Sequence, residues 1–154
     1  MTGFHLLPLT APLLIAASGV AQSRAATLGV FEGRTPCGRI AVEFTGFPGA
    51  GCEKIKWRLT LYQDSITGRP TTFKYQGTRT TREGTWVLTR GTASDPRAAV
   101  VRLNPPAPHP SIRLQRVDDV LLLLDAAGKV LTGDASWSYT LNRLEVPARH
   151  GPAR

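Results

Sequence analysis

A period-two alternation of apolar and polar residues recurs along the chain and limits it to a structure built from half-buried strands. The clearest case is residues 55–62, where apolar side chains fall on one face and charged or hydroxyl side chains on the other. The apolar face carries Ile55, Trp57, Leu59 and Leu61. Such alternation is typical of an antiparallel strand with one face in the core.

Similar segments follow at short intervals, separated by turn residues such as those of 64–70 and 125–129. Further strands are expected at residues 28–33, 40–44, 73–76, 84–90, 100–103, 112–117, 120–124 and 137–141. No segment has the spacing of a helix. We therefore predict an all-β fold, a small antiparallel up-and-down barrel of about eight strands like that of lipocalins, since closure removes exposed edges.

The first residues have the composition of an export signal. Residues 6–21 are almost entirely apolar and contain Pro8 and Pro12, and they are shorter than the roughly 18 to 20 residues of a spanning helix. Small residues follow, as at a cleavage site. We expect residues 1–26 to be a signal peptide, 27–143 a single domain and 144–154 a flexible tail. The alternative for the first segment is a buried strand or helix.

Cys37 and Cys52 are the only cysteines. In an oxidising compartment such a pair is expected to form a structural disulfide, whereas reduced thiols would suit a metal or redox site. The export signal favours the disulfide, with metal ligation by Cys37 and Cys52 left open only for the reduced chain. Apart from this alternative, we expect no cofactor.

The formal net charge is +8, mostly from arginine. Such a basic surface either is simply solvated or suits anionic surroundings, for example lipid headgroups or polyanionic sugars of the cell envelope. The arginines are scattered singly and export removes the chain from nucleic acid, so no nucleic-acid partner is expected. After leader removal no transmembrane span remains to be assigned.

Catalytic patterns are scarce. His109 and His150 are the only histidines after the predicted leader, and both fall in segments without strand periodicity. A nucleophile would need a positioned base, so we predict that the protein is not an enzyme. Large aromatic residues could instead line a small-ligand pocket inside the barrel or simply fill its core. They are Trp57, Phe73, Tyr75, Trp86 and Trp137.

Several segments together resemble the N-terminal domain of the NlpE family of outer-membrane lipoproteins, which is linked to copper resistance and envelope stress. The opening strand and first cysteine match at Gly29–Cys37, and the part after the second cysteine matches at Cys52–Ile55. Gly84–Trp86, Leu121–Gly128 and Tyr139–Arg143 match later strands and a turn of the family. The resemblance covers nearly the whole chain after the leader.

Two departures change what the resemblance implies. The family's cysteines are two residues apart, a spacing that suits one soft metal ion such as Cu(I), whereas Gly38–Gly51 separates them here. The lipid-attachment cysteine typical of the family's lipoproteins is also missing, so we expect a non-lipidated form. Copper binding is therefore carried over only weakly.

The sequence thus predicts a non-catalytic NlpE-like module in the periplasm or secreted from a Gram-negative cell. It would act in envelope-stress or copper-related sensing, or bind an envelope protein. A lipocalin-like ligand binder and a periplasmic hydrolase inhibitor are the alternatives. The basic charge argues against an inhibitor of lysozymes, which are themselves typically basic.

Overall fold

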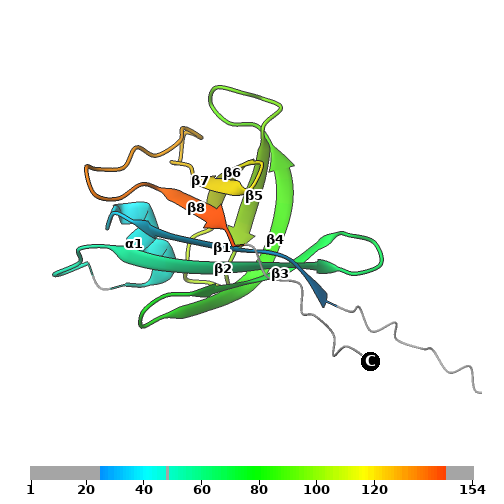
Figure 1. Cartoon of the computed structure of the whole chain (residues 1–154), viewed down its shortest axis with the longest axis horizontal. Helices are drawn as coiled ribbons and strands as arrows, with labels where there is room; N and C mark the ends of the chain where they lie inside the picture. Colours follow the sequence, from blue (N-terminus) through cyan, green and yellow to red (C-terminus); the bar gives the residue numbers. More distant parts are fainter. Residues whose placement is uncertain (1–24, 48, 145–154) are drawn as a thin grey trace, which may run out of the picture.

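Eight antiparallel strands, each paired with the next along the chain, close into a barrel (Figure 1). The computed structural model describes residues 25–47 and 49–144. The strands are β1 (Ala25–Thr35), β2 (Ile55–Asp64), β3 (Pro70–Gln76), β4 (Thr81–Arg90), β5 (Ala99–Asn104), β6 (Ile112–Val117), β7 (Val120–Leu123) and β8 (Thr140–Arg143). A short helix, α1 (Arg39–Thr45), lies between β1 and β2. The predicted all-β up-and-down barrel is confirmed.

The predicted leader and tail fall largely outside the described residues. Ala25 and Ala26, which we placed in the leader, are the first two residues of β1. Of the predicted tail, only Leu144 is described. Within the described ranges, no helix has both the length and the apolar character needed to cross a bilayer.

The inward face of β2 shows why the alternation produces a barrel. Ile55, Trp57, Leu59 and Leu61 are each at most 3% exposed, as the pattern predicts, while Lys56 between them is exposed. Burying one such side chain contributes about 1.5 to 3 kcal/mol. The same arrangement on the other strands fills the interior with Phe31, Phe73, Tyr75, Trp86, Leu103, Leu114, Leu121, Leu123 and Leu141.

The segment 40–44, predicted as a strand, is part of helix α1, and the expectation of a fold without helices was wrong. Ala41, Phe44 and Thr45 are its buried residues, and their spacing is that of one helical face. Gly46 ends the helix in the left-handed conformation with φ 66°, and its N–H donates to the carbonyl of Val42 at 2.8 Å. Burial of this face at the end of the barrel outweighs the local strand-like pattern.

The predicted last strand also begins later than expected. Trp137 and Tyr139 lie in the connection that precedes β8, which starts at Thr140. Only Leu141 of the predicted apolar positions is therefore on the strand. The segment 137–141 was correct in place but wrong in extent.

The two ends of the barrel differ. α1 lies at the end where β1 finishes and β2 begins, and the β2–β3, β4–β5 and β6–β7 connections lie at the opposite end (Figure 1). In the β2–β3 turn, Asp64 Oδ1 accepts backbone N–H bonds from Thr67 at 2.7 Å and Ile66 at 3.0 Å. These bonds, that of the Thr67 N–H first, hold the pKa of Asp64 below its ordinary value.

The seam between β1 and β8 closes the barrel with few contacts. Only two partner pairs join these strands, at Phe31 and Glu32, whereas β1 pairs with β2 along its whole length. The guanidinium of Arg143 adds a hydrogen bond to the carbonyl of Leu28 at 2.7 Å. The seam therefore joins residues more than a hundred positions apart in the sequence.

Candidate functional site

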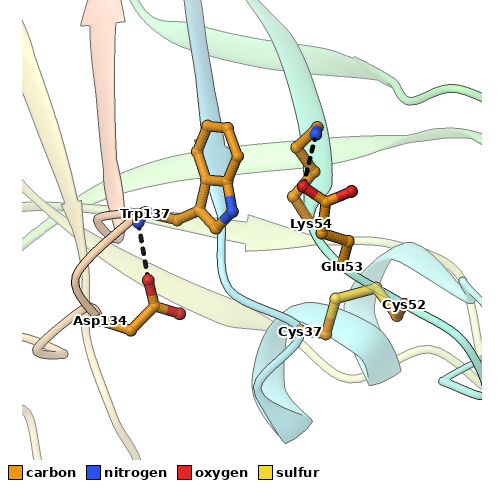
Figure 2. A network of polar contacts seen from close by, with 6 residues as sticks. All are labelled: Cys37, Cys52, Glu53, Lys54, Asp134 and Trp137. Atoms are coloured by element: carbon orange, nitrogen blue, oxygen red, sulfur yellow. Dashed lines mark hydrogen bonds and ion pairs between the residues drawn. A yellow bond between two sulfur atoms is a disulfide. The ribbon is translucent and has the colours of Figure 1, made fainter.

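The disulfide predicted between Cys37 and Cys52 is present. Their Cα atoms are 6.0 Å apart, and both residues are half-buried against the core. The bond joins the segment after β1 to the segment before β2, and so encloses α1 in a covalent loop (Figure 2). Both thiols are used by the bond, so in this state neither is a thiolate ligand for a metal.

Phe44, which the sequence reasoning had not singled out, closes the barrel at the α1 end. Its ring stacks on Trp57 with centroids 5.6 Å apart and an interplanar angle of 7°. It also contacts Phe73 at 6.1 Å and meets Tyr75 edge-on at 5.9 Å. Aromatic pairs at such separations stabilise each other beyond their buried area. Three of the predicted pocket residues are therefore packed around a fourth ring.

The polar atoms of the buried aromatics have partners within the fold. Trp57 Nε1 donates to the hydroxyl of Thr35 at 2.9 Å, and Trp86 Nε1 donates to the carbonyl of Tyr62 at 2.7 Å. The hydroxyl of Tyr75 donates to the carbonyl of Lys56 at 3.2 Å, and burial raises its pKa. These contacts suit a core that is complete without a ligand.

Trp137 is separate from the other predicted pocket residues because it lies on the outside of the barrel. Its loop is fixed by Asp134, whose Oδ1 accepts the N–H of Trp137 at 2.7 Å and that of Ser136 at 2.8 Å. Gly133 is needed there because a Cβ would clash with the Trp137 carbonyl. Figure 2 shows the indole beside Lys54, with Asp134 on the loop next to it.

Two cations lie close to the Trp137 ring. Lys54 Nζ lies 4.8 Å from the ring centroid, and the Arg34 guanidinium carbon lies 5.9 Å from it. Both distances are within the range of cation–π attraction. Lys54 also pairs with Glu53 at 3.0 Å. The sequence places Arg34 and Lys54 far from Trp137, so only the barrel brings this cluster together.

Candidate metal ligands do not gather in the part of the chain that the structure describes. No three side chains of His, Cys, Asp or Glu there are close enough to share an ion. His109, half-buried in the β5–β6 connection, is the one histidine in that part. His5 and His150 lie outside the described residues.

The fold defines the protein as a small closed up-and-down barrel with a disulfide-bounded helix at one end. Comparison with protein families matches residues 44–134 to the NlpE N-terminal domain. The match spans more than half of the chain, and the chain belongs to the NlpE family. The resemblance predicted from the sequence is thus confirmed, with α1 and the long spacing between the cysteines as local features. Searches of curated proteins and of solved structures found no match.

Family membership supports an envelope location, since NlpE is a family of cell-envelope proteins. The matched segment begins at Phe44 and ends at Asp134, so it includes the ring that closes the barrel and the residue that fixes the Trp137 loop. Cys37, Arg34 and Trp137 lie outside it. The cationic cluster, which consists of Arg34, Lys54 and Trp137, therefore lies only partly within the matched segment.

Proposed function

We propose that this NlpE-like module is an exported, non-catalytic scaffold of the Gram-negative envelope, active in envelope-stress or copper-related sensing. The observation that carries the proposal is the packing of Phe44 on Trp57, Phe73 and Tyr75. Because these rings pack against one another, the outer surface is left for recognition. The proposed partner is an envelope protein, and the proposed compartment is the periplasm.

Copper has a limited part in this proposal. With Cys37 and Cys52 joined, their sulfur atoms are not available as thiolates, the form that binds Cu(I). An effect on copper tolerance would then come from sensing envelope damage instead of from chelation. Export is supported by the apolar segment 6–21, and an oxidising compartment would favour the disulfide.

The first test is the intact mass of the protein recovered from the host envelope, with and without thiol alkylation. We expect a chain cleaved between Ala21 and Ala26, two hydrogens lighter than the dithiol, without lipid and inert to alkylation. Two alkylatable thiols or a copper adduct would refute the scaffold with a structural disulfide.

The second test is genetic. Deletion of the gene is expected to change the output of an envelope-stress reporter, and the wild-type chain should restore it. A Cys37→Ser, Cys52→Ser variant present at equal abundance should also restore it if the disulfide serves stability alone. A deletion without effect on the reporter or on growth in copper would contradict the proposed role.

A further inference from the structure

A groove of about 780 Å³ runs along the outer face of the barrel beside Trp137. Its floor carries the outward side chains of β1 and β2, including Arg34 and Lys56, and one wall is the loop that precedes β8. It crosses the β1–β8 seam, where Thr140 and Asn142 contribute side chains from β8. The groove is thus built from both ends of the folded chain.

Arg34 and Lys56 give the groove a positive charge that the protein leaves unmatched. They are directly opposite each other in the β1–β2 ladder, and both are exposed. Like charges in that position destabilise a sheet. Neither residue takes part in an ion pair within residues 25–47 and 49–144, whereas the neighbouring Arg58 is paired with Glu32. An anion held between them would remove the repulsion.

The barrel contains another pair of cations on opposite positions of neighbouring strands, but one of them has hydrogen-bond partners within the fold. Arg102 of β5 is opposite Arg113 of β6. Arg113, however, donates to the main-chain carbonyls of Asp125 at 3.0 Å and Ala126 at 2.8 Å. Its charge is therefore partly satisfied within the fold, while that of the Arg34–Lys56 pair faces the groove.

The charge extends into an adjoining hollow of about 300 Å³, which shares Lys56 and Thr78 with the groove. Arg79 lines that hollow, and no ion pair of the described chain includes it. Glu32 and Glu53 also line the hollows, but each is paired, with Arg58 and Lys54 respectively. This leaves Arg34, Lys56 and Arg79 as a series of cations without an ion pair in the described chain. Such a series suits a ligand with repeated negative charges better than a single small anion.

The remaining lining is rich in hydroxyl and amide groups around an aromatic ring. Among the described residues that line the groove, Leu144 is the only one with an aliphatic side chain. The Trp137 indole N–H donates no hydrogen bond within the described ranges, although those of Trp57 and Trp86 do. The hydroxyl and amide groups belong to Gln76, Thr78, Ser136, Ser138, Thr140 and Asn142.

We propose that this groove binds an acidic carbohydrate chain. Carboxylates of successive sugar units would pair with Arg34, Lys56 and Arg79, and sugar hydroxyls would bond to the hydroxyl and amide side chains. The Trp137 indole would supply an N–H donor and an apolar surface beside them. This binding goes beyond the proposed sensing role and does not depend on it.

Other anionic partners fit the groove less well. An acidic peptide gains affinity from apolar pockets or from an open sheet edge. The described part of the closed barrel offers neither beside the groove. A lipid surface needs inserted apolar side chains in addition to cations. Both partners are outcomes of the experiment below.

The test is calorimetric titration of the purified, disulfide-bonded chain with polygalacturonate, with dextran as the neutral polymer. Arg34→Gln, Lys56→Gln is compared with Arg97→Gln, Arg102→Gln, which removes the same charge from exposed sites outside the groove. Trp137→Ala forms a third variant that changes no charge. Poly-glutamate and vesicles containing phosphatidylglycerol test the other two classes.

We expect polygalacturonate to bind and dextran not to bind. The dissociation constant should rise about tenfold or more in the groove pair and in Trp137→Ala, and less than about threefold in the distant pair. Equal losses in the two charge pairs would overturn the proposal, because binding would then reflect overall charge. Absence of polygalacturonate binding would also overturn the proposal. The same holds if poly-glutamate or the vesicles bind at least as tightly as polygalacturonate and Trp137→Ala does not weaken that binding.

Discussion

At the α1 end of the barrel, a buried ring and a disulfide close the interior, whereas at the opposite end short turns connect the strands. Phe44 at the α1 end is fully buried, while Ile66 in the β2–β3 turn is 85% exposed. The first end depends on contacts between residues distant in sequence. The second depends on bonds within a few residues, such as those that Asp64 accepts from its own turn.

The difference shows where a strand-only barrel needs additional structure. Tight turns satisfy their own backbone groups locally and can remain exposed. A longer connection, in which Cys37 and Cys52 stand 15 positions apart, has to be ordered by something else. Here the ordering comes from packing and a covalent bond, so we expect substitutions at the two ends to differ greatly in effect.

The largest effect is expected from Phe44→Ala. Loss of the ring leaves a cavity against Trp57, and truncations of this kind lower the free energy of unfolding by about 3 to 5 kcal/mol. Urea unfolding followed by circular dichroism measures the change. Ile66→Ala at the opposite end is the control, with an expected change within about 0.5 kcal/mol. Similar values for the two variants would show that the ends do not differ.

The disulfide should have the next largest effect. Cys37→Ala, Cys52→Ala is expected to lower the free energy of unfolding by about 3 kcal/mol, because the unfolded chain regains the freedom of a fifteen-residue loop. The same urea titration, with and without reductant, measures it. Reductant should destabilise the wild-type chain and leave the variant unchanged. If the variant were as stable as the wild type, packing alone would order the connection at this end.

The disulfide and the helix at the α1 end also show what could be predicted from sequence. The disulfide followed from the cysteine count and the export signal. The helix did not, because Ile40, Val42 and Phe44 alternate as in a strand, and because the rings on which Phe44 packs come from β2 and β3. Gly46, two positions after Phe44, was the available signal, since glycine commonly ends a helix.

The cationic cluster illustrates a second limit of sequence reasoning. Trp137 was grouped with Trp57 as a residue that could line a pocket inside the barrel or fill its core. The turn set by Asp134 instead places Trp137 outside the barrel. Its neighbours Arg34 and Lys54 belong to other segments, so their meeting depends on barrel closure. Alternation of apolar and polar residues shows which side of the sheet a side chain faces only where the residue is on a strand.

A moderate effect is expected at alkaline pH from Tyr75, whose ring packs against Phe44. Its buried phenol has a raised pKa, so the folded chain keeps the proton above the ordinary value of 10.0 at which the unfolded chain loses it. Stability from this group is complete below that value and is lost as the pH rises through the raised pKa. Tyr75→Phe, which cannot ionise, should therefore lose less stability between about pH 8 and about pH 11. Parallel pH profiles would refute this.

The smallest effect is expected from Asp64 in the turn at the other end. The lowered pKa means that its contribution is present above the ordinary value of 3.8 and is lost as the pH falls through the lower folded pKa. Asp64→Asn should show a slightly smaller loss of stability in acid, with thermal unfolding as the measurement. A larger difference than that seen for Tyr75 would reverse the ranking of the two ends.

The narrow seam between β1 and β8 has a consequence for the order in which the chain can assemble. The disulfide needs only the first 52 residues, whereas the seam needs Asn142 and Arg143. A chain that emerges with its N-terminus first can therefore form the covalent loop while β1 still has a free edge. Until β8 arrives, that edge and the edge of β7 are open to other chains, so truncation before residue 140 is expected to cause aggregation and not only loss of stability.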